Sequence, residues 1–166
     1  MRTLVIFTAG VVTALAAQRV VVDVRAQDAG APDSGVVALN HVGLAVSDVG
    51  AAAVYYSGTM GFREAFRNEA GTSIYLQISQ GTFLELQQAS DRTPAGITHF
   101  GLEVGDIAAA VETFRRRGAT ASDPRGPSAF SGAILANVTD PDGFRIELAE
   151  LGPDSLQRKA MEAWKP

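Results

Sequence analysis

The two histidines of this chain occupy matching positions in two copies of one sequence pattern. The first copy reads NHVGLAVSDVGAA around His41, and the second reads THFGLEVGDIAAA around His99. Each copy continues to a short strand-like segment that contains a glutamate, Glu85 in FLEL and Glu147 in RIEL. A duplicated unit with one His and one Glu per copy brings four side chains that bind metals to the interface between its halves. The repeat therefore predicts both a two-module fold and a metal site.

The composition suits one folded domain and removes several classes of function. Hydrophobic residues make up 46% and charged residues 19% of the 166 residues, which is ordinary for a soluble protein with a real core. Net charge is −4, and the basic run at 115–117 ends a predicted helix, so no basic surface for nucleic acid is expected. The chain has no cysteine, which excludes disulfides, thiolate ligands and a cysteine nucleophile. A metal must be held by nitrogen and oxygen atoms.

The first 26 residues have the order of a secretory signal peptide. A positive start with Arg2 precedes a mostly apolar run at 4–17, and small residues at Val24-Arg25-Ala26 favour cleavage near Ala26. An uncleaved anchor is the alternative, but the apolar run is shorter than the roughly 20 residues that span a bilayer. We expect an exported protein, periplasmic or secreted, with no membrane span after cleavage. Residues 27–36 are predicted to be a flexible leader.

The rest of the chain is predicted to form two βαβββ modules, residues 37–89 and 97–151, followed by a C-terminal helix within 152–166. Asp48 and Asp106 are placed to cap the helices of the two modules, because their carboxylates can accept the free amides of a first turn. The expected elements of the first module are a strand at 37–46, a helix at 49–57 that ends at the glycines 58 and 61, and strands at 62–67, 73–79 and 82–88. Those of the second are a strand at 97–104, a helix at 107–117, and strands at 120–122, 133–138 and 144–150. The last helix, about 155–164, is expected to pack outside the repeat.

Strand parity predicts which side chains face the core. Alternate residues of a strand point to opposite faces, so one set packs on the helices: Val42, Leu44, Val46, Leu84, Leu86, Phe100, Leu102, Val104, Ile146 and Leu148. Both histidines and both glutamates fall on the other, helix-free face, where small neighbours such as Gly43 and Gly101 leave space around the imidazoles. One strand His or Glu alone is more often structural. Four of them in register favour a metal site.

The motifs NHVGLAVSD, FLEL, THFGLEVGD and DPDGFRIEL together resemble the glyoxalase/bleomycin resistance/dioxygenase superfamily, also called the vicinal oxygen chelate fold. The resemblance covers residues 37–151. It implies an α+β fold in which paired βαβββ modules form a curved sheet around a metal-binding cup. It also implies that one divalent ion (Zn, Ni, Co, Mn or Fe) is held by His41, Glu85, His99 and Glu147.

The ligand set is closest to that of glyoxalase I-like lyases, so the resemblance implies a metal-dependent lyase or isomerase. Such an enzyme acts next to a carbonyl of a small oxygenated substrate through a metal-stabilised enediolate, with Glu147 or Glu85 as the catalytic base. A non-heme iron extradiol-type dioxygenase and a non-catalytic binding or resistance protein of the same fold stay open as alternatives. A homodimer is also possible, with the site inside one chain or shared by two.

Further polar residues have parities that point them into the same cup. Arg145 is suited to a two-pronged contact with a substrate carboxylate. The candidate substrate-binding residues are Tyr75, Gln77, Glu103, Asn137 and Arg145.

Overall fold

The computed structural model describes residues 34–165, so the predicted signal peptide and most of the leader lie outside the described residues. The first module contains β1 (Val36–Val46), α1 (Val49–Met60), β2 (Arg63–Arg67), β3 (Ser73–Ser79) and β4 (Thr82–Gln88). The second contains β5 (Gly96–Val104), α2 (Ile107–Arg116), β6 (Thr120–Ala121), β7 (Ile134–Thr139) and β8 (Arg145–Glu150), and α3 (Leu156–Glu162) follows. The predicted order of elements in the two modules is confirmed.

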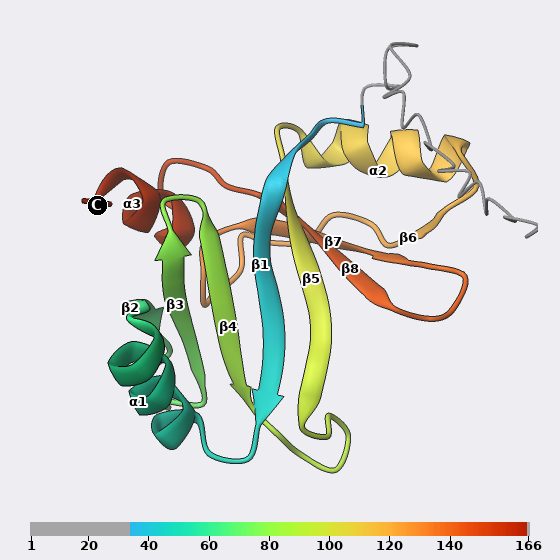
Figure 1. Ribbon diagram of the computed structural model, residues 1–166. Helices are drawn as coiled ribbons and strands as arrows, with labels where there is room; N and C mark the ends of the chain where they lie inside the picture. The colour runs from blue at the N-terminus through green and yellow to red at the C-terminus, as the bar shows by residue number, and fades with distance from the viewer. Residues whose placement is uncertain (1–33, 166) are drawn as a thin grey trace, which may run out of the picture. The chain divides into compact units, whose positions relative to one another are not determined.

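All eight strands form one mixed sheet in the order β2-β3-β4-β1-β5-β8-β7-β6 (Figure 1). Within each module the first strand runs parallel to the last, β1 beside β4 and β5 beside β8. The modules meet where β1 and β5 pair antiparallel at the centre of the sheet. The strands that carry the repeated histidines are therefore direct neighbours, and the strands that carry the glutamates flank them.

The capping aspartates act as the sequence predicts. The Asp48 carboxylate accepts the amide of Ala51 at 2.8 Å, and Asp106 accepts the amide of Ala109 at 2.9 Å. The predicted end of the first helix at residue 57 was wrong by one turn, since α1 continues to Met60 and ends at Gly61 with φ of 73°. Only the second glycine of the pair provides the left-handed backbone that stops a helix.

The helices α1 and α2 cover one face of the sheet, which we call the helix face. Val49 and Ala53 of α1 pack on Leu84 and Leu86 beside Val42, while α2 packs on a second cluster built on the β5, β7 and β8 strands. The parity prediction is confirmed for these core residues with one exception. Phe100 shares the parity but is 37% exposed, because α2 packs nearer Val104, at the C-terminal end of β5.

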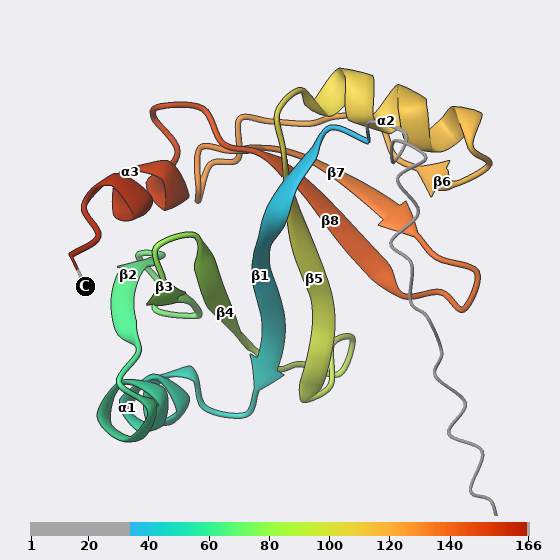
Figure 2. The same ribbon diagram turned by 45° about the horizontal axis from the view of Figure 1, so that its top comes forward.

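The opposite face, which we call the cup face, is not free of helices as the sequence suggested. Helix α3 packs there, since Met161 joins a small cluster with Ala149 and Leu151, whose side chains lie opposite those of the helix-face core. Figure 2 shows α3 near β2. Met161 also comes close to Gly81, at the turn between β3 and β4. The C-terminal helix therefore lies against one end of the cup rather than outside the repeat.

Among residues 34–165, no helix has both the length and the apolar character needed to cross a membrane.

Candidate metal centre

The register of the four central strands places two rows of side chains on the cup face. In the first row Glu85 of β4 lies beside Gly43 of β1, which pairs with His99 of β5. In the second row His41 of β1 pairs with Gly101 of β5, which lies beside Glu147 of β8. Each row is thus a carboxylate, a glycine and an imidazole, and each joins a glutamate from one module to a histidine from the other.

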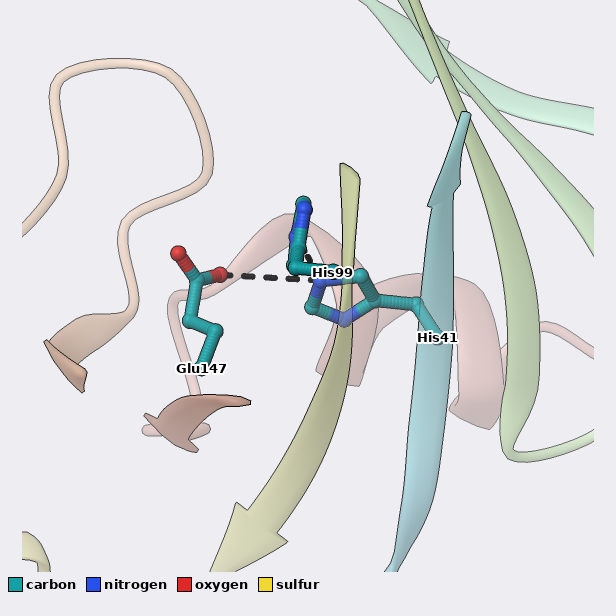
Figure 3. Close-up of side chains that lie close together, drawn as sticks. All are labelled: His41, His99 and Glu147. Atoms are coloured by element: carbon teal, nitrogen blue, oxygen red, sulfur yellow. Dashed lines mark hydrogen bonds and ion pairs between the residues drawn. The ribbon is translucent and has the colours of Figure 1, made fainter. Parts of the chain in front are cut away.

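The four polar side chains converge above these rows. The Nε2 atoms of His41 and His99 lie 3.0 Å apart, and the Glu85 Oε2 atom lies 3.9 Å and 3.3 Å from them respectively. The Glu147 Oε1 atom lies 3.6 Å from Nε2 of His41. Donor atoms of His41, His99 and Glu147 all lie within 4.8 Å of one another, and Figure 3 shows these three side chains pointing toward a common centre. All four residues are buried.

The two glycines make room for the imidazoles. A Cβ atom at Gly101 would lie 2.0 Å from Cε1 of His41, and one at Gly43 would lie 2.2 Å from Cε1 of His99. The sequence showed that a small residue follows each histidine, but not that each glycine serves the histidine of the other module. That exchange follows from the antiparallel pairing of β1 with β5.

Two residues that the sequence analysis missed hold the other edge of each imidazole. The Asn40 Oδ1 atom lies 3.0 Å from Nδ1 of His41, and the Thr98 Oγ1 atom lies 2.9 Å from Nδ1 of His99. The available signal was that a polar residue immediately precedes His in both copies of the pattern. With Nδ1 occupied in this way, each ring directs Nε2 to the centre.

The environment of the centre keeps His41 neutral and shifts the pKa values of the two glutamates in opposite directions. Burial lowers the pKa of His41 to about 4, although the Glu85 carboxylate acts in the other direction. Burial also tends to raise the pKa of Glu85, but the hydrogen bond from His99 and the electrostatic influence of the nearby His41 outweigh it, so the net shift is downward. Burial raises the pKa of Glu147 and prevails over the nearby His99 and Arg145. A neutral imidazole is the form that binds a metal.

Two arginines lie on the Glu147 side of the centre. Arg145 Nη1 donates to Glu147 Oε2 at 3.1 Å and to Asn137 Oδ1 at 3.3 Å, while its Nη2 lies 2.5 Å from Nδ1 of His99. Arg125, which the sequence analysis did not identify, places its Nη2 atom 3.9 Å from the same Glu147 oxygen. It lies in the irregular segment between β6 and β7, and no repeat or motif marks it. Both guanidinium groups are partly exposed, so this side of the centre is open to solvent and positively charged.

The first module contributes an aromatic wall. Tyr75 is buried with its ring centroid 5.5 Å from that of His41, and it stacks on Phe66 at 4.6 Å. Phe130, which belongs to the second module, contacts the rings of both Phe66 and Tyr75. Burial, followed by the charges of Glu85 and Glu147, raises the pKa of Tyr75 well above its usual value, so the phenol stays protonated.

The structure places the other two predicted substrate-binding residues against the C-terminal helix. Gln77 donates to the Ala160 carbonyl at 3.2 Å and accepts from Arg63 at 2.5 Å. Glu103 accepts from Arg158 at 2.7 Å. Both lie on the cup face as predicted, but the contacts of their polar atoms hold α3 and do not reach the four converging side chains.

The model of the Glyoxalase/Bleomycin resistance protein/Dioxygenase superfamily matches residues 38–148. The chain belongs to this superfamily. Its fold is shared by solved methylmalonyl-CoA epimerases. One from Mycobacterium tuberculosis has a TM-score of 0.61 at 23% identity and covers 73% of this chain and 92% of its own. Another, from Streptomyces coelicolor with 2-nitronate-propionyl-CoA bound, has a TM-score of 0.55 at 21% identity, covering 69% and 97%.

Curated relatives within the superfamily match over one module's length. A probable chloroplastic lactoylglutathione lyase of Arabidopsis thaliana is 41% identical over 59 residues, which is 36% of this chain and 17% of that protein. The lactoylglutathione lyase of Salmonella typhimurium is 40% identical over 52 residues, 31% of this chain and 38% of its own. The matched segments therefore span well under half of these relatives.

The geometry of this superfamily member fits a divalent ion. At a metal–ligand distance of about 2.1 Å, neighbouring ligands lie about 3.0 Å apart in an octahedron and about 3.4 Å apart in a tetrahedron. The His–His and His–Glu distances of 3.0, 3.3, 3.6 and 3.9 Å bracket these values. Two imidazoles with two carboxylates suit Zn, Ni, Co, Mn or Fe. His41, His99 and Glu147 form a group that could bind the ion, and Glu85 approaches both of its imidazoles.

Proposed function

We propose that this protein is a metal-dependent lyase or isomerase of the glyoxalase type, which moves a proton next to a carbonyl of a small oxygenated substrate. One observation carries the proposal: side chains from four central strands converge, with both Nε2 atoms and one oxygen from each glutamate facing one centre. The local similarity to lactoylglutathione lyases supports the same class. A divalent ion held there would polarise the substrate carbonyl as a Lewis acid.

Glu147 is the better candidate for the catalytic base. Its Oε1 atom faces His41 at 3.6 Å, whereas its Oε2 atom faces the partly exposed Arg145 and Arg125. Glu85 instead directs Oε2 toward both histidines and has Ser73 at 3.5 Å from Oε1, on the side away from the arginines. A base must reach the proton that it removes, and the open side of the centre is where a substrate enters. Glu147 has one oxygen on that side.

The remaining residues bind and orient the substrate. Arg145 and Arg125 are placed to hold an anionic or carbonyl oxygen beside Glu147, since guanidinium groups donate paired hydrogen bonds to oxygens. Tyr75 with Phe66 provides an apolar wall that keeps water from the other side of His41. Asn137 keeps Arg145 in place through its Oδ1 atom.

The experiment combines metal analysis with a proton-exchange assay. Metal-stripped protein is titrated with Zn²⁺, Ni²⁺ and Co²⁺, and each form is incubated in D₂O with hemithioacetals, acyl thioesters and 2-hydroxy ketones. We expect one metal per chain and deuterium entry at the carbon next to the carbonyl. Glu147→Gln should abolish the exchange while the protein still binds metal. Failure to bind any of the three ions, or no exchange with any substrate class, contradicts the proposal.

One observation also favours a non-heme iron dioxygenase as a second candidate. One group in the centre that could hold an ion is two histidines and one carboxylate, His41, His99 and Glu147, which is the ligand set of iron enzymes that keep positions open for oxygen. The approach of Glu85 to both imidazoles argues for a fourth ligand and against this reading. Ring-cleavage colour with catechols after anaerobic Fe²⁺ loading would favour the dioxygenase. Colourless reactions across a catechol panel would exclude it.

A further inference from the structure

The residue before each histidine is held in an unusual way by the backbone. Neighbouring side chains of a regular strand point to opposite faces, so a residue next to a cup-face histidine should face the helices. The β1–β5 pairing shifts register between Leu39 and His41 and again between Gly43 and Leu44. The residues left over are Asn40 on β1 and Thr98 on β5. A bulge of this kind re-aims a side chain, and here it brings Asn40 and Thr98 beside the rings that follow them.

The burial of Asn40 points to a role beyond packing. The residue is fully buried, and its Nδ2 atom has no hydrogen-bond partner within residues 34–165. A buried amide with an unpaired donor costs free energy that an apolar residue of the same size would not. The contact that it does make is the one between its Oδ1 atom and Nδ1 of His41.

The contacts of Nδ1 differ between the two rings. The Asn40 carbonyl oxygen only accepts, so its contact fixes the proton of His41 on Nδ1 and leaves Nε2 to bind a metal. Nδ1 of His99 has two neighbours, the Thr98 hydroxyl at 2.9 Å and Nη2 of Arg145 at 2.5 Å. The hydroxyl can accept a proton from that nitrogen, whereas the guanidinium can only donate.

We propose that Asn40 and Thr98 are positioning residues of the metal centre, and that Arg145 competes with Thr98 for His99. A His99 ring that binds the ion through Nε2 keeps its proton on Nδ1, where the Thr98 hydroxyl can accept it at 2.9 Å. The Arg145 guanidinium cannot accept it, so Arg145 must withdraw from that nitrogen. The guanidinium released from His99 stays beside Glu147, where it can meet a substrate. The inference rests on the proposed metal site but not on the proposed reaction.

The first test reads the tautomers directly. The chain has two histidines, so a long-range ¹H–¹⁵N spectrum of the untagged protein contains two imidazoles, assigned with a His41→Gln variant. With Zn²⁺ added, both rings should carry the proton at Nδ1 and bind the ion through Nε2. A Zn²⁺-loaded spectrum in which either ring is protonated at Nε2 overturns the proposal.

The second test measures the Zn²⁺ dissociation constant by competition with a chromophoric chelator. Asn40→Leu and Thr98→Val should weaken binding by about 10- to 100-fold, the usual loss when the partner of a ligating histidine is removed. Asn40→Asp and Thr98→Ser keep an acceptor and should stay near the wild type, as should Thr113→Val on α2. Arg145→Met should tighten binding by about tenfold, because a competing hydrogen bond and a like charge are both removed.

Unchanged affinity in both Asn40→Leu and Thr98→Val, with native circular dichroism, overturns the proposal. These readouts need no substrate, so they separate the inference from the proposed function. If the variants weaken Zn²⁺ binding as expected but no substrate is turned over, the positioning roles stand and the proposed reaction fails.

Discussion

Replacing Gly101 by alanine tests the arrangement of the centre with a single methyl group. Gly101 does not have a positive φ, so alanine fits the backbone and the change acts through the added Cβ alone. That atom would lie 2.0 Å from Cε1, 2.3 Å from Nδ1 and 2.6 Å from Nε2 of His41. Since carbon atoms pack at about 3.5 Å, the ring must retreat by about 1.5 Å.

The size of the effect follows from comparing this displacement of the ring with the range of ligand distances that a metal site allows. Ligand distances in such sites vary by about 0.2 Å, so a displacement of about 1.5 Å removes His41 from coordination. We expect Zn²⁺ binding to weaken by at least about 100-fold, more than the loss of a partner that only orients a ligand. The metal-free protein should lose about 1 to 2 kcal/mol of stability, because overpacking outweighs the gain from replacing a strand glycine.

The assay is chelator competition for Zn²⁺ together with urea unfolding of the metal-free protein. Gly58→Ala is the matched control, because a Cβ there meets nothing within 4 Å and the site lies on α1. It should keep Zn²⁺ affinity and gain about 1 kcal/mol of stability as a helix-interior glycine is removed. In a His41→Ala background, Gly101→Ala should cost little further affinity, since the ring that it displaces is gone. Zn²⁺ affinity of Gly101→Ala within threefold of the wild type would refute the reasoning.

Three further predictions address other parts of the chain. In metal-free protein, the folded-state pKa of His41 lies at about 4 against 6.5 unfolded, so the unfolded chain binds more protons between these values. Stability should therefore fall by about 3 kcal/mol as the pH drops from about 6.5 to about 4, and urea unfolding of His41→Gln should show a smaller fall. Arg158→Met should cost about 3 kcal/mol in urea unfolding, because it leaves the Glu103 carboxylate buried and unpaired, and Glu103→Leu in the same chain should recover most of the loss. We propose that the first 26 residues are a cleaved signal peptide: mass spectrometry of the protein produced in a secreting host should give a chain beginning at Gln27, and a retained Met1 would exclude cleavage. Loss of Arg2, Arg19, Arg25 and Asp23 would change the net charge from −4 to −6.

The fold could be predicted because the repeat supplied long-range information that periodicity alone does not contain. Alternating strands and two capping aspartates define local elements. The matching positions of His41 and His99 within the two copies of the pattern add that the halves are equivalent and meet symmetrically. The exposure of Phe100 and the packing of α3 on the cup face were not predicted, because the repeat determines neither. Packing between distant segments decides how far a helix extends over a strand. It also decides which face of the sheet a terminal helix covers.

The four side chains that converge could be predicted from the sequence, whereas Asn40 and Thr98, which contact the two imidazoles, could not. Parity assigns His41, Glu85, His99 and Glu147 to one face, but it also assigns Asn40 and Thr98 to the other. The register shifts in the β1–β5 pair overturn the second assignment, and no residue type marks them in advance.

The closest His–Glu contacts of the centre join residues of different modules. Glu85 meets His99, and Glu147 meets His41, each over a glycine of the intervening strand. Neither module therefore supplies all four side chains, and the complete set forms only where β1 and β5 are paired. Metal binding and the docking of the modules are consequently one equilibrium: an ion that binds this centre must stabilise the β1–β5 pairing by the free energy of its own binding. Slowed amide exchange on β1 and β5 after Zn²⁺ addition, with little change at α1, is the pattern that this coupling requires.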